Sequence, residues 1–203
     1  MEPIENVILD MGGVLLDLDE RATYQAFVRL GLKSVPQDLA EANLDFQRGK
    51  LSARQFADYL RRYLPEGVSR EQVCRAWCAM LGEVPERRRE YLRQLGRRYR
   101  LFLLSNTDDI HIECLRTRMD LEDFERLFER VYYSQRTGFR KPESGIFRLV
   151  LTDNSLDASR TLFVDDSPEN VDGARSVGLQ ARWLDLSHES FEHLAQELLS
   201  RKP

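Results

Sequence analysis

The chain has 203 residues, 42% of them hydrophobic and 32% charged, a balance typical of one globular protein with a buried core. Its formal net charge of −4 gives no general attraction to nucleic acid or to anionic membranes. The sequence shows no secretory signal and no apolar run near the roughly 20 residues that span a bilayer, so we expect a cytoplasmic protein without a membrane or nucleic-acid partner. Three cysteines, an odd number, also favour a reducing compartment over a disulfide scaffold.

The N-terminal part of the chain predicts one strand followed by a helical insert. Residues 5–10 are rich in β-forming side chains and too short for a helix. A pair of glycines then breaks the chain. Residues 19–84 have helical periodicity and no convincing strand, and prolines divide them into separate helices, at Pro36, Pro65 and Pro85.

From Pro85 onward, predicted strands and helices alternate. We expect strands at 101–104, 131–133, 161–165 and 180–184, and helices at 86–98, 108–118, 143–152, 168–177 and 188–200. Such alternation indicates a parallel sheet with helices on both faces. We therefore predict an α/β fold, a Rossmann-like three-layer parallel sheet with an inserted helical-bundle cap. Residues 1–17 and 85–203 would form the sheet domain and 18–84 the cap.

Polar residues follow four of the apolar segments. Asp10 ends the first, Ser105 and Asn106 follow the second, Lys141 comes after the third, and the pair Asp165 and Asp166 ends the fourth. The carboxyl ends of parallel strands open onto one crevice, so these side chains should converge. A nucleophilic carboxylate, a hydroxyl, an ammonium group and a carboxylate pair suit phosphoryl transfer through an aspartyl-phosphate.

Each motif also has an ordinary structural interpretation. The acidic pair is also consistent with an N-cap before Ser167-Pro168, although capping needs only one acid. Ser105 is compatible with a turn and Lys141 with solvent. Seven arginines within 87–100 suit either a nucleic-acid patch or a solvated helix face, and the interleaved glutamates favour the latter. Cys74 and Cys78 share a helix face but lack further ligands, so packing is favoured over metal binding.

Taken together and in this order, the motifs resemble those of the haloacid dehalogenase (HAD)-like hydrolase superfamily. The resembling segments are Asp10–Asp17, Ser105-Asn106, Lys141-Pro142 and Asp165–Asn170, and the insert stands where the family carries a cap. The likeness is greatest to phosphatases with a helical cap, including bacterial glucose-1-phosphate phosphatases. It implies a Mg²⁺-dependent phosphatase that hydrolyses a small phosphorylated metabolite, of sugar phosphate type.

The resemblance also implies a role for each motif residue. Asp10 would be the nucleophile, and Ser105 and Lys141 would complete the catalytic set. Lys141, Ser105, Gly13 and the backbone N–H of Asn106 would bind substrate. The expected Mg²⁺ ligands are Asp10, the carbonyl of Gly12, Asp165 and Asp166, the last directly or through water.

One position departs from the family pattern. The usual motif has a second aspartate two residues after the nucleophile, as general acid and base, and this chain has Gly12 there. General acid–base catalysis contributes roughly 10²–10⁴-fold, so we expect a bias towards leaving groups of low pKa, such as anomeric sugar phosphates. Asp17, seven residues after the nucleophile, is read as structural.

Several expectations remain about the cap and the alternatives. Arg21, Tyr24, Phe46 and Arg48 are candidates to line the substrate site, and Trp183 is expected in the core. The alternatives are a haloacid dehalogenase, which needs no metal, and a phospholigand-binding pseudo-enzyme without the general acid. We expect a monomer or homodimer whose partner is a small-molecule phosphate ester.

Overall fold

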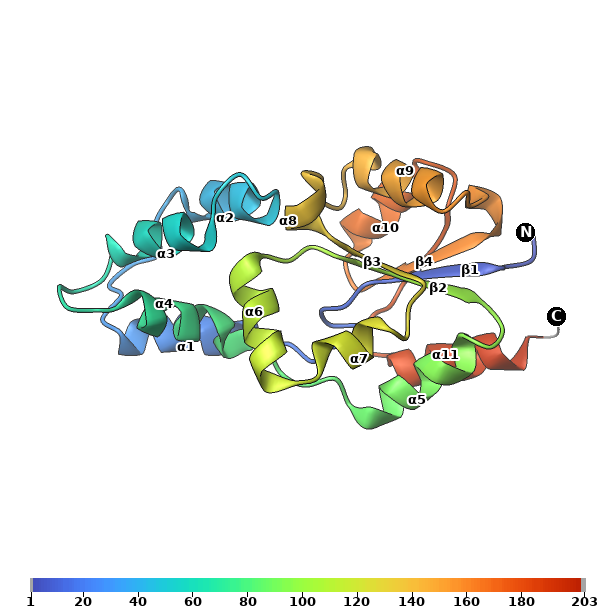
Figure 1. Cartoon of the computed structure of the whole chain (residues 1–203), viewed down its shortest axis with the longest axis horizontal. Coiled ribbons are helices and arrows are strands. Elements are labelled where there is room, and N and C mark those ends of the chain that lie inside the picture. Colours follow the sequence, from blue (N-terminus) through green and yellow to red (C-terminus); the bar gives the residue numbers. More distant parts are fainter. Residues whose placement is uncertain (1, 202–203) are drawn as a thin grey trace.

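The computed structural model describes residues 2–201 and contains one sheet of five parallel strands (Figure 1). The strands run β3-β2-β1-β4-β5 across the sheet, and their bounds are β1 Asn6–Leu9, β2 Arg100–Ser105, β3 Arg130–Tyr133, β4 Thr161–Asp165 and β5 Gln180–Trp183. The register aligns Val7 with Leu101 on one side and with Leu162 on the other. All five predicted strands are therefore present, within two residues of the expected bounds at each end.

Helices cover both faces of this sheet, which confirms the predicted three-layer fold. One face packs against α5 (Glu86–Leu95) and α11 (Phe191–Ser200), which contact each other, and the other against α9 (Ser144–Asp153) and α10 (Pro168–Arg175) (Figure 1). The strand side chains alternate between these two cores, with period two. Leu101 and Leu103 face α5 and α11, whereas Phe102 and Leu104 face α9 and α10.

The other helices of the sheet domain lie between β2 and β4 in the sequence. They are α6 (Asp109–Arg118), α7 (Leu121–Glu125), α8 (Ser134–Thr137) and the 3-10 turn η2 (Ala158–Arg160). The sequence pattern missed α7 and α8, which have too few residues to show a periodic apolar face. The helix expected at 188–200 begins only at Phe191, because Ser190 caps it by accepting from the His193 amide.

A lobe of four helices stands between β1 and α5. It consists of α1 (Glu20–Arg29), α2 (Leu39–Gln47), α3 (Ala53–Arg61), α4 (Arg70–Trp77) and the 3-10 turn η1 (Cys78–Met80). Ser52 and Ser69 begin α3 and α4 with capping boxes, in which a glutamine three residues later bonds back to the cap. Phe46 stacks on Phe56 with ring centroids 4.3 Å apart, at the centre of the lobe.

Two neighbouring linkers join this lobe to the sheet. The amide of Asp17 donates to the Glu83 carbonyl at 3.1 Å, Gly82 donates back to Asp17 at 2.9 Å, and Asp19 donates to Met80 at 2.9 Å. The linkers thus form a short antiparallel ribbon. The Asp17 carboxylate accepts from Arg88 at 2.8 Å, which fits its predicted structural role.

The prediction that Trp183 lies in the core was wrong. Trp183 ends β5, an edge strand, and its side chain is 44% exposed. Its indole nitrogen donates to the Asp166 carbonyl at 2.9 Å, so the ring covers the loop after β4 instead of filling the interior.

Candidate active site

Three charged side chains meet at the carboxyl edge of the sheet, two from the ends of β1 and β4 and one from the loop after α8. Lys141 donates to Asp10 Oδ1 at 2.6 Å, to Asp165 Oδ2 at 2.6 Å and to the Leu104 carbonyl at 2.9 Å. These bonds use all three N–H donors of the ammonium group, which is 1% exposed. The predicted convergence of Asp10, Lys141 and Asp165 is thus present in the structure.

The electrostatic balance of this cluster favours an additional cation. Burial raises the pKa of Asp10 to about 7, although Lys141 opposes the shift, and the Asp165 carboxylate adds to it. Burial also raises the pKa of Asp166, followed by repulsion from Asp165. Burial alone would lower the pKa of Lys141, but the carboxylates of Asp10 and Asp165 outweigh it and raise that pKa. The single positive charge of Lys141 therefore faces the carboxyl groups of Asp10, Asp165 and Asp166.

The three carboxylates lie close enough together to hold a small divalent cation. Oxygen atoms of Asp10, Asp165 and Asp166 all lie within 4.8 Å of one another. Asp165 is held in place by the Ser167 amide and by Asn170 Nδ2, each 2.9 Å from its Oδ1. This cluster suits Mg²⁺, a hard ion that prefers carboxylate oxygens and retains water. Asn170 thus fixes the loop after β4.

Both glycines of the motif-one loop have close neighbours. Gly13 has φ +77°, and a Cβ there would lie 2.2 Å from Asp166 Oδ2, so a side chain is excluded. Gly12 is outside the left-handed region, and its Cβ would meet only the side chain of Leu18, with Cδ1 at 2.8 Å. Leu18 therefore borders the position where the family's second aspartate would stand.

The segment after β2 reveals a contact that the sequence did not predict. Asn106 Nδ2 donates to the Lys141 carbonyl and Asn106 Oδ1 accepts from the Lys141 amide, both at 2.9 Å. The side chain of Asn106 therefore fixes the backbone of Lys141, in addition to the backbone role expected for Asn106. Ser105 is buried at the end of β2. No signal in the sequence links Asn106 to a residue 35 positions away.

The four cap residues proposed from the sequence have different locations. Arg48 reaches the core, where its Nε and Nη2 donate to Glu143 Oε1 at 3.0 and 2.5 Å. Phe46 is 1% exposed and belongs to the interior of the helical lobe, so its assignment to the substrate site was wrong. Arg21 and Tyr24 are exposed on α1, and Tyr24 keeps 57% of its surface accessible.

A second contact between lobe and core involves His111 of α6. The Trp77 indole donates to Asp108 Oδ2 at 3.0 Å, and the His111 ring stacks on Trp77 with centroids 5.6 Å apart. His111 Nδ1 lies 3.1 Å from Asp108 Oδ2. Asp108 is buried and is the N-cap of α6, three residues after Ser105. The helical lobe thus contacts the segment that follows β2.

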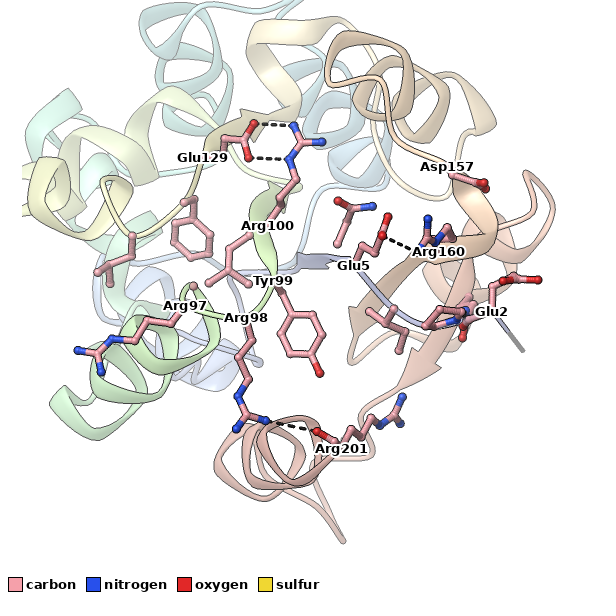
Figure 2. A pocket seen from close by; sticks show the side chains of 18 of the residues that line it. Glu2, Glu5, Arg97, Arg98, Tyr99, Arg100, Glu129, Asp157, Arg160 and Arg201 are labelled. Carbon is pink, nitrogen blue, oxygen red and sulfur yellow. Dashed lines mark hydrogen bonds and ion pairs between the residues drawn. The ribbon is translucent and has the colours of Figure 1, made fainter. Parts of the chain in front are cut away.

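The opposite edge of the sheet carries a broad depression lined by charged residues (Figure 2). Two of its arginines form ion pairs with acidic residues of the same depression, Arg100 with Glu129 at 2.6 Å and Arg160 with Glu5 (Figure 2). Four arginines of the segment 87–100 pair with acidic side chains in this way, namely Arg88, Arg89, Arg93 and Arg100. These pairs favour the solvated-face interpretation of that segment.

Residues 4–178 match the haloacid dehalogenase-like hydrolase family. The chain belongs to this family. Over 188 residues it is 30% identical to the D-ribitol-5-phosphate phosphatase of Bacteroides thetaiotaomicron, which covers 87% of this chain and 90% of that protein. It is 28% identical to the glyceraldehyde 3-phosphate phosphatase of Pyrococcus abyssi, with 89% and 81% covered.

A solved structure extends this similarity to three dimensions. The magnesium complex of a HAD family enzyme from Bacteroides thetaiotaomicron superposes with a TM-score of 0.87 at 30% identity, and 95% of this chain and 98% of that chain are covered. The family and fold predictions are thus confirmed, whereas the likeness to glucose-1-phosphate phosphatases stays a prediction. Within residues 2–201, none of the helices has the length and apolar character to span a membrane.

Proposed function

We propose that this hydrolase is a Mg²⁺-dependent phosphatase of small phosphate monoesters that acts through phosphorylated Asp10. The observation that carries the proposal is the buried cluster in which Lys141 contacts both Asp10 and Asp165, with Asp166 close by. A substrate phosphate is anionic, so such a site needs positive charge from Lys141 and from a metal ion. The phosphatase names of two relatives and the magnesium complex of a similar solved structure support this assignment.

The proposed chemistry divides the displacement into two steps. Asp10 Oδ2 attacks phosphorus while Lys141 holds Oδ1, the bond from phosphorus to the leaving oxygen breaks, and the leaving alkoxide takes a proton from water. Water then attacks phosphorus and loses its proton to solvent, the bond to Asp10 breaks, and inorganic phosphate departs. Lys141 and Ser105 would stabilise the phosphoryl oxygens through both steps.

The proposed metal ligands are Asp10, Asp165, Asp166 and the Gly12 carbonyl. When bound, Mg²⁺ would reduce the repulsion between Asp10 and the phosphate and neutralise charge that develops during transfer. Gly13 keeps Asp166 in reach of this site because it has no side chain. Gly13 and the Asn106 amide complete the proposed phosphate-binding set.

We assign residues 18–84 to the cap and residues 1–17 with 85–203 to the catalytic core. The linker ribbon lies at the boundary between these parts, and Arg48 and Trp77 contact the core beside the catalytic loops. A cap in this position would exclude water and select the organic part of the substrate.

The leaving group is the finer part of the proposal. Gly12 cannot donate a proton, which favours leaving groups of low pKa such as anomeric phosphates. The phosphates in the names of the two relatives are alkyl esters, so both ester types belong in a test panel. A haloacid dehalogenase needs no metal, so the cluster of three acids would have no role in it. A protein that only binds phosphoesters would need no nucleophile.

Phosphate release from such a panel, with and without Mg²⁺, tests the proposal. We expect activity that requires Mg²⁺ and is lost by several orders of magnitude in Asp10→Asn, which keeps the shape but not the nucleophile. Acid-quenched protein should carry phosphate on Asp10, detected by mass spectrometry. Halide release from 2-haloacids without metal, or tight binding of phosphoesters without turnover, would refute it.

A further inference from the structure

Gln135 stands beside the segment proposed to bind phosphate. The preceding residue, Ser134, is fully buried and begins α8 directly after β3. Its Oγ accepts from the Thr107 amide and donates to the Thr107 carbonyl, both at 3.1 Å. Thr107 is two residues beyond Ser105. The start of α8 is therefore tied to the loop after β2, and Gln135 lies at its border.

The side chain of Gln135 presents an oriented acceptor. Its Nε2 donates to Asp109 Oδ1 at 3.3 Å, which fixes the amide, because the reverse orientation would set its oxygen against the carboxylate. The other atom, Oε1, is buried and has no hydrogen-bond partner. A buried acceptor without a donor is costly and rare, so such an atom calls for an explanation.

The helical lobe provides a second acceptor of this kind. Helix α2 contacts α8, and Figure 1 shows the end of α2 beside α8. The turn after α2 approaches so closely that a Cβ on Gly49 would lie 2.2 Å from the Gln135 carbonyl oxygen. Gln47 accepts from Arg140 at 3.0 Å, and one turn earlier Asn43 has a buried Oδ1 without a partner.

Among residues 2–201, the buried side-chain oxygens without a partner are these two, Asn43 Oδ1 and Gln135 Oε1. They belong to α2 and α8, one of the pairs of elements through which the lobe contacts the loops at the carboxyl edge of the sheet. Hydroxyl groups on the organic part of a phosphate ester are donors of the kind that both oxygens lack.

We propose that Gln135 and Asn43 form a subsite for hydroxyl groups, so that the substrate is the phosphate monoester of a polyhydroxylated small molecule. This inference rests on the proposed phosphatase function. An ester without hydroxyls leaves both acceptors unpaired inside the complex. A site built to bond a substrate hydroxyl discriminates strongly against the analogue that lacks it.

A matched pair of substrates tests the subsite, namely D-ribitol 5-phosphate and n-pentyl phosphate, two primary esters of five-carbon chains. With Mg²⁺, we expect the wild type to favour the ribitol ester by about 10²-fold or more in kcat/KM. Gln135→Met and Asn43→Leu should each reduce this ratio by about tenfold, mainly through KM for the ribitol ester. Gln94→Met, the same change on an exposed position of α5, should keep the wild-type ratio.

Thermal melting separates substrate binding from a structural role. Asn43→Leu removes an unpaired buried acceptor, so its Tm should equal or exceed that of the wild type even though its selectivity falls. Equal kcat/KM for the two esters in the wild type, or an unchanged ratio in both variants, would overturn the inference while leaving phosphatase activity intact. Absence of phosphate release from every ester, p-nitrophenyl phosphate included, would instead refute the proposed function and this inference with it.

Discussion

Restoring a carboxyl group at position 12 tests whether the missing proton donor limits the reaction. In Gly12→Asp, the new Cβ meets only Leu18 Cδ1 at 2.8 Å, the end of a flexible side chain that is 38% exposed and free to turn away. The backbone of Gly12 is outside the left-handed region, so no strain arises there. Displacing Leu18 costs about 1 kcal/mol, and the lost glycine flexibility returns roughly 0.4–1 kcal/mol, so stability should change little.

The expected gain is in rate and depends on the leaving group. General acid catalysis is worth roughly 10²–10⁴-fold, and it matters most where the departing oxygen is basic. We expect kcat/KM for alkyl phosphates to rise by about 10²-fold and that for p-nitrophenyl phosphate to change by less than about threefold. Gly12→Asn, which has the same shape without the acid, is the control. Equal gains for both esters, or the same gain in Gly12→Asn, would contradict the reasoning.

Three further predictions concern the charged cluster. Lys141→Met should abolish turnover and cost about 3–5 kcal/mol of stability in a denaturant melt, because Asp10 and Asp165 lose their buried partner; unchanged stability would argue against the ion pairs. Gly13→Ala should weaken Mg²⁺ binding at least about tenfold by calorimetry, since its Cβ displaces Asp166, and wild-type affinity would exclude Asp166 as a ligand. The pKa of Asp10 is about 7 in the folded protein and 3.8 in the unfolded chain, so the folded state binds this proton more tightly. The resulting stabilisation of the metal-free protein is complete below pH 3.8 and is lost as the pH rises through 7. Mg²⁺ competes with that proton, so its affinity should fall about tenfold from pH 8 to pH 6 and its effect on Tm should shrink; a pH-independent Tm shift would refute this.

The sheet and its catalytic edge followed from local sequence signals. The three central strands β1, β2 and β4 are short, mostly apolar runs bounded by polar or turn residues, and a buried parallel strand needs no longer-range information to be recognised. Asp10, Ser105 and Asp165 each end such a run, so their convergence followed from sheet topology alone. Lys141 was placed by its motif rather than by a strand.

Contacts that depend on helix rotation were not predictable. Phe46 and Arg48 are two residues apart on α2 and its C-cap, yet one fills the lobe interior and the other reaches Glu143. In so short a helix, the sequence pattern does not show which side chains point into the lobe and which point outward. The bond between Asn106 and Lys141 depends likewise on how two loops meet in space. Trp183 was wrongly predicted to lie in the core because a tryptophan ring is apolar. Its nitrogen instead donates to the Asp166 carbonyl at the surface of an edge strand.

The two linkers at Asp17 and Gly82 have a consequence for the architecture of the whole chain. The chain enters and leaves the helical lobe at neighbouring positions. The Gly82 amide donates to the Asp17 carbonyl at 2.9 Å, as at the base of a hairpin. The strand order of the doubly wound sheet therefore does not depend on which segment is inserted between Asp17 and Gly82. An insert of another size or shape would fit at this junction without any change in the order of the strands.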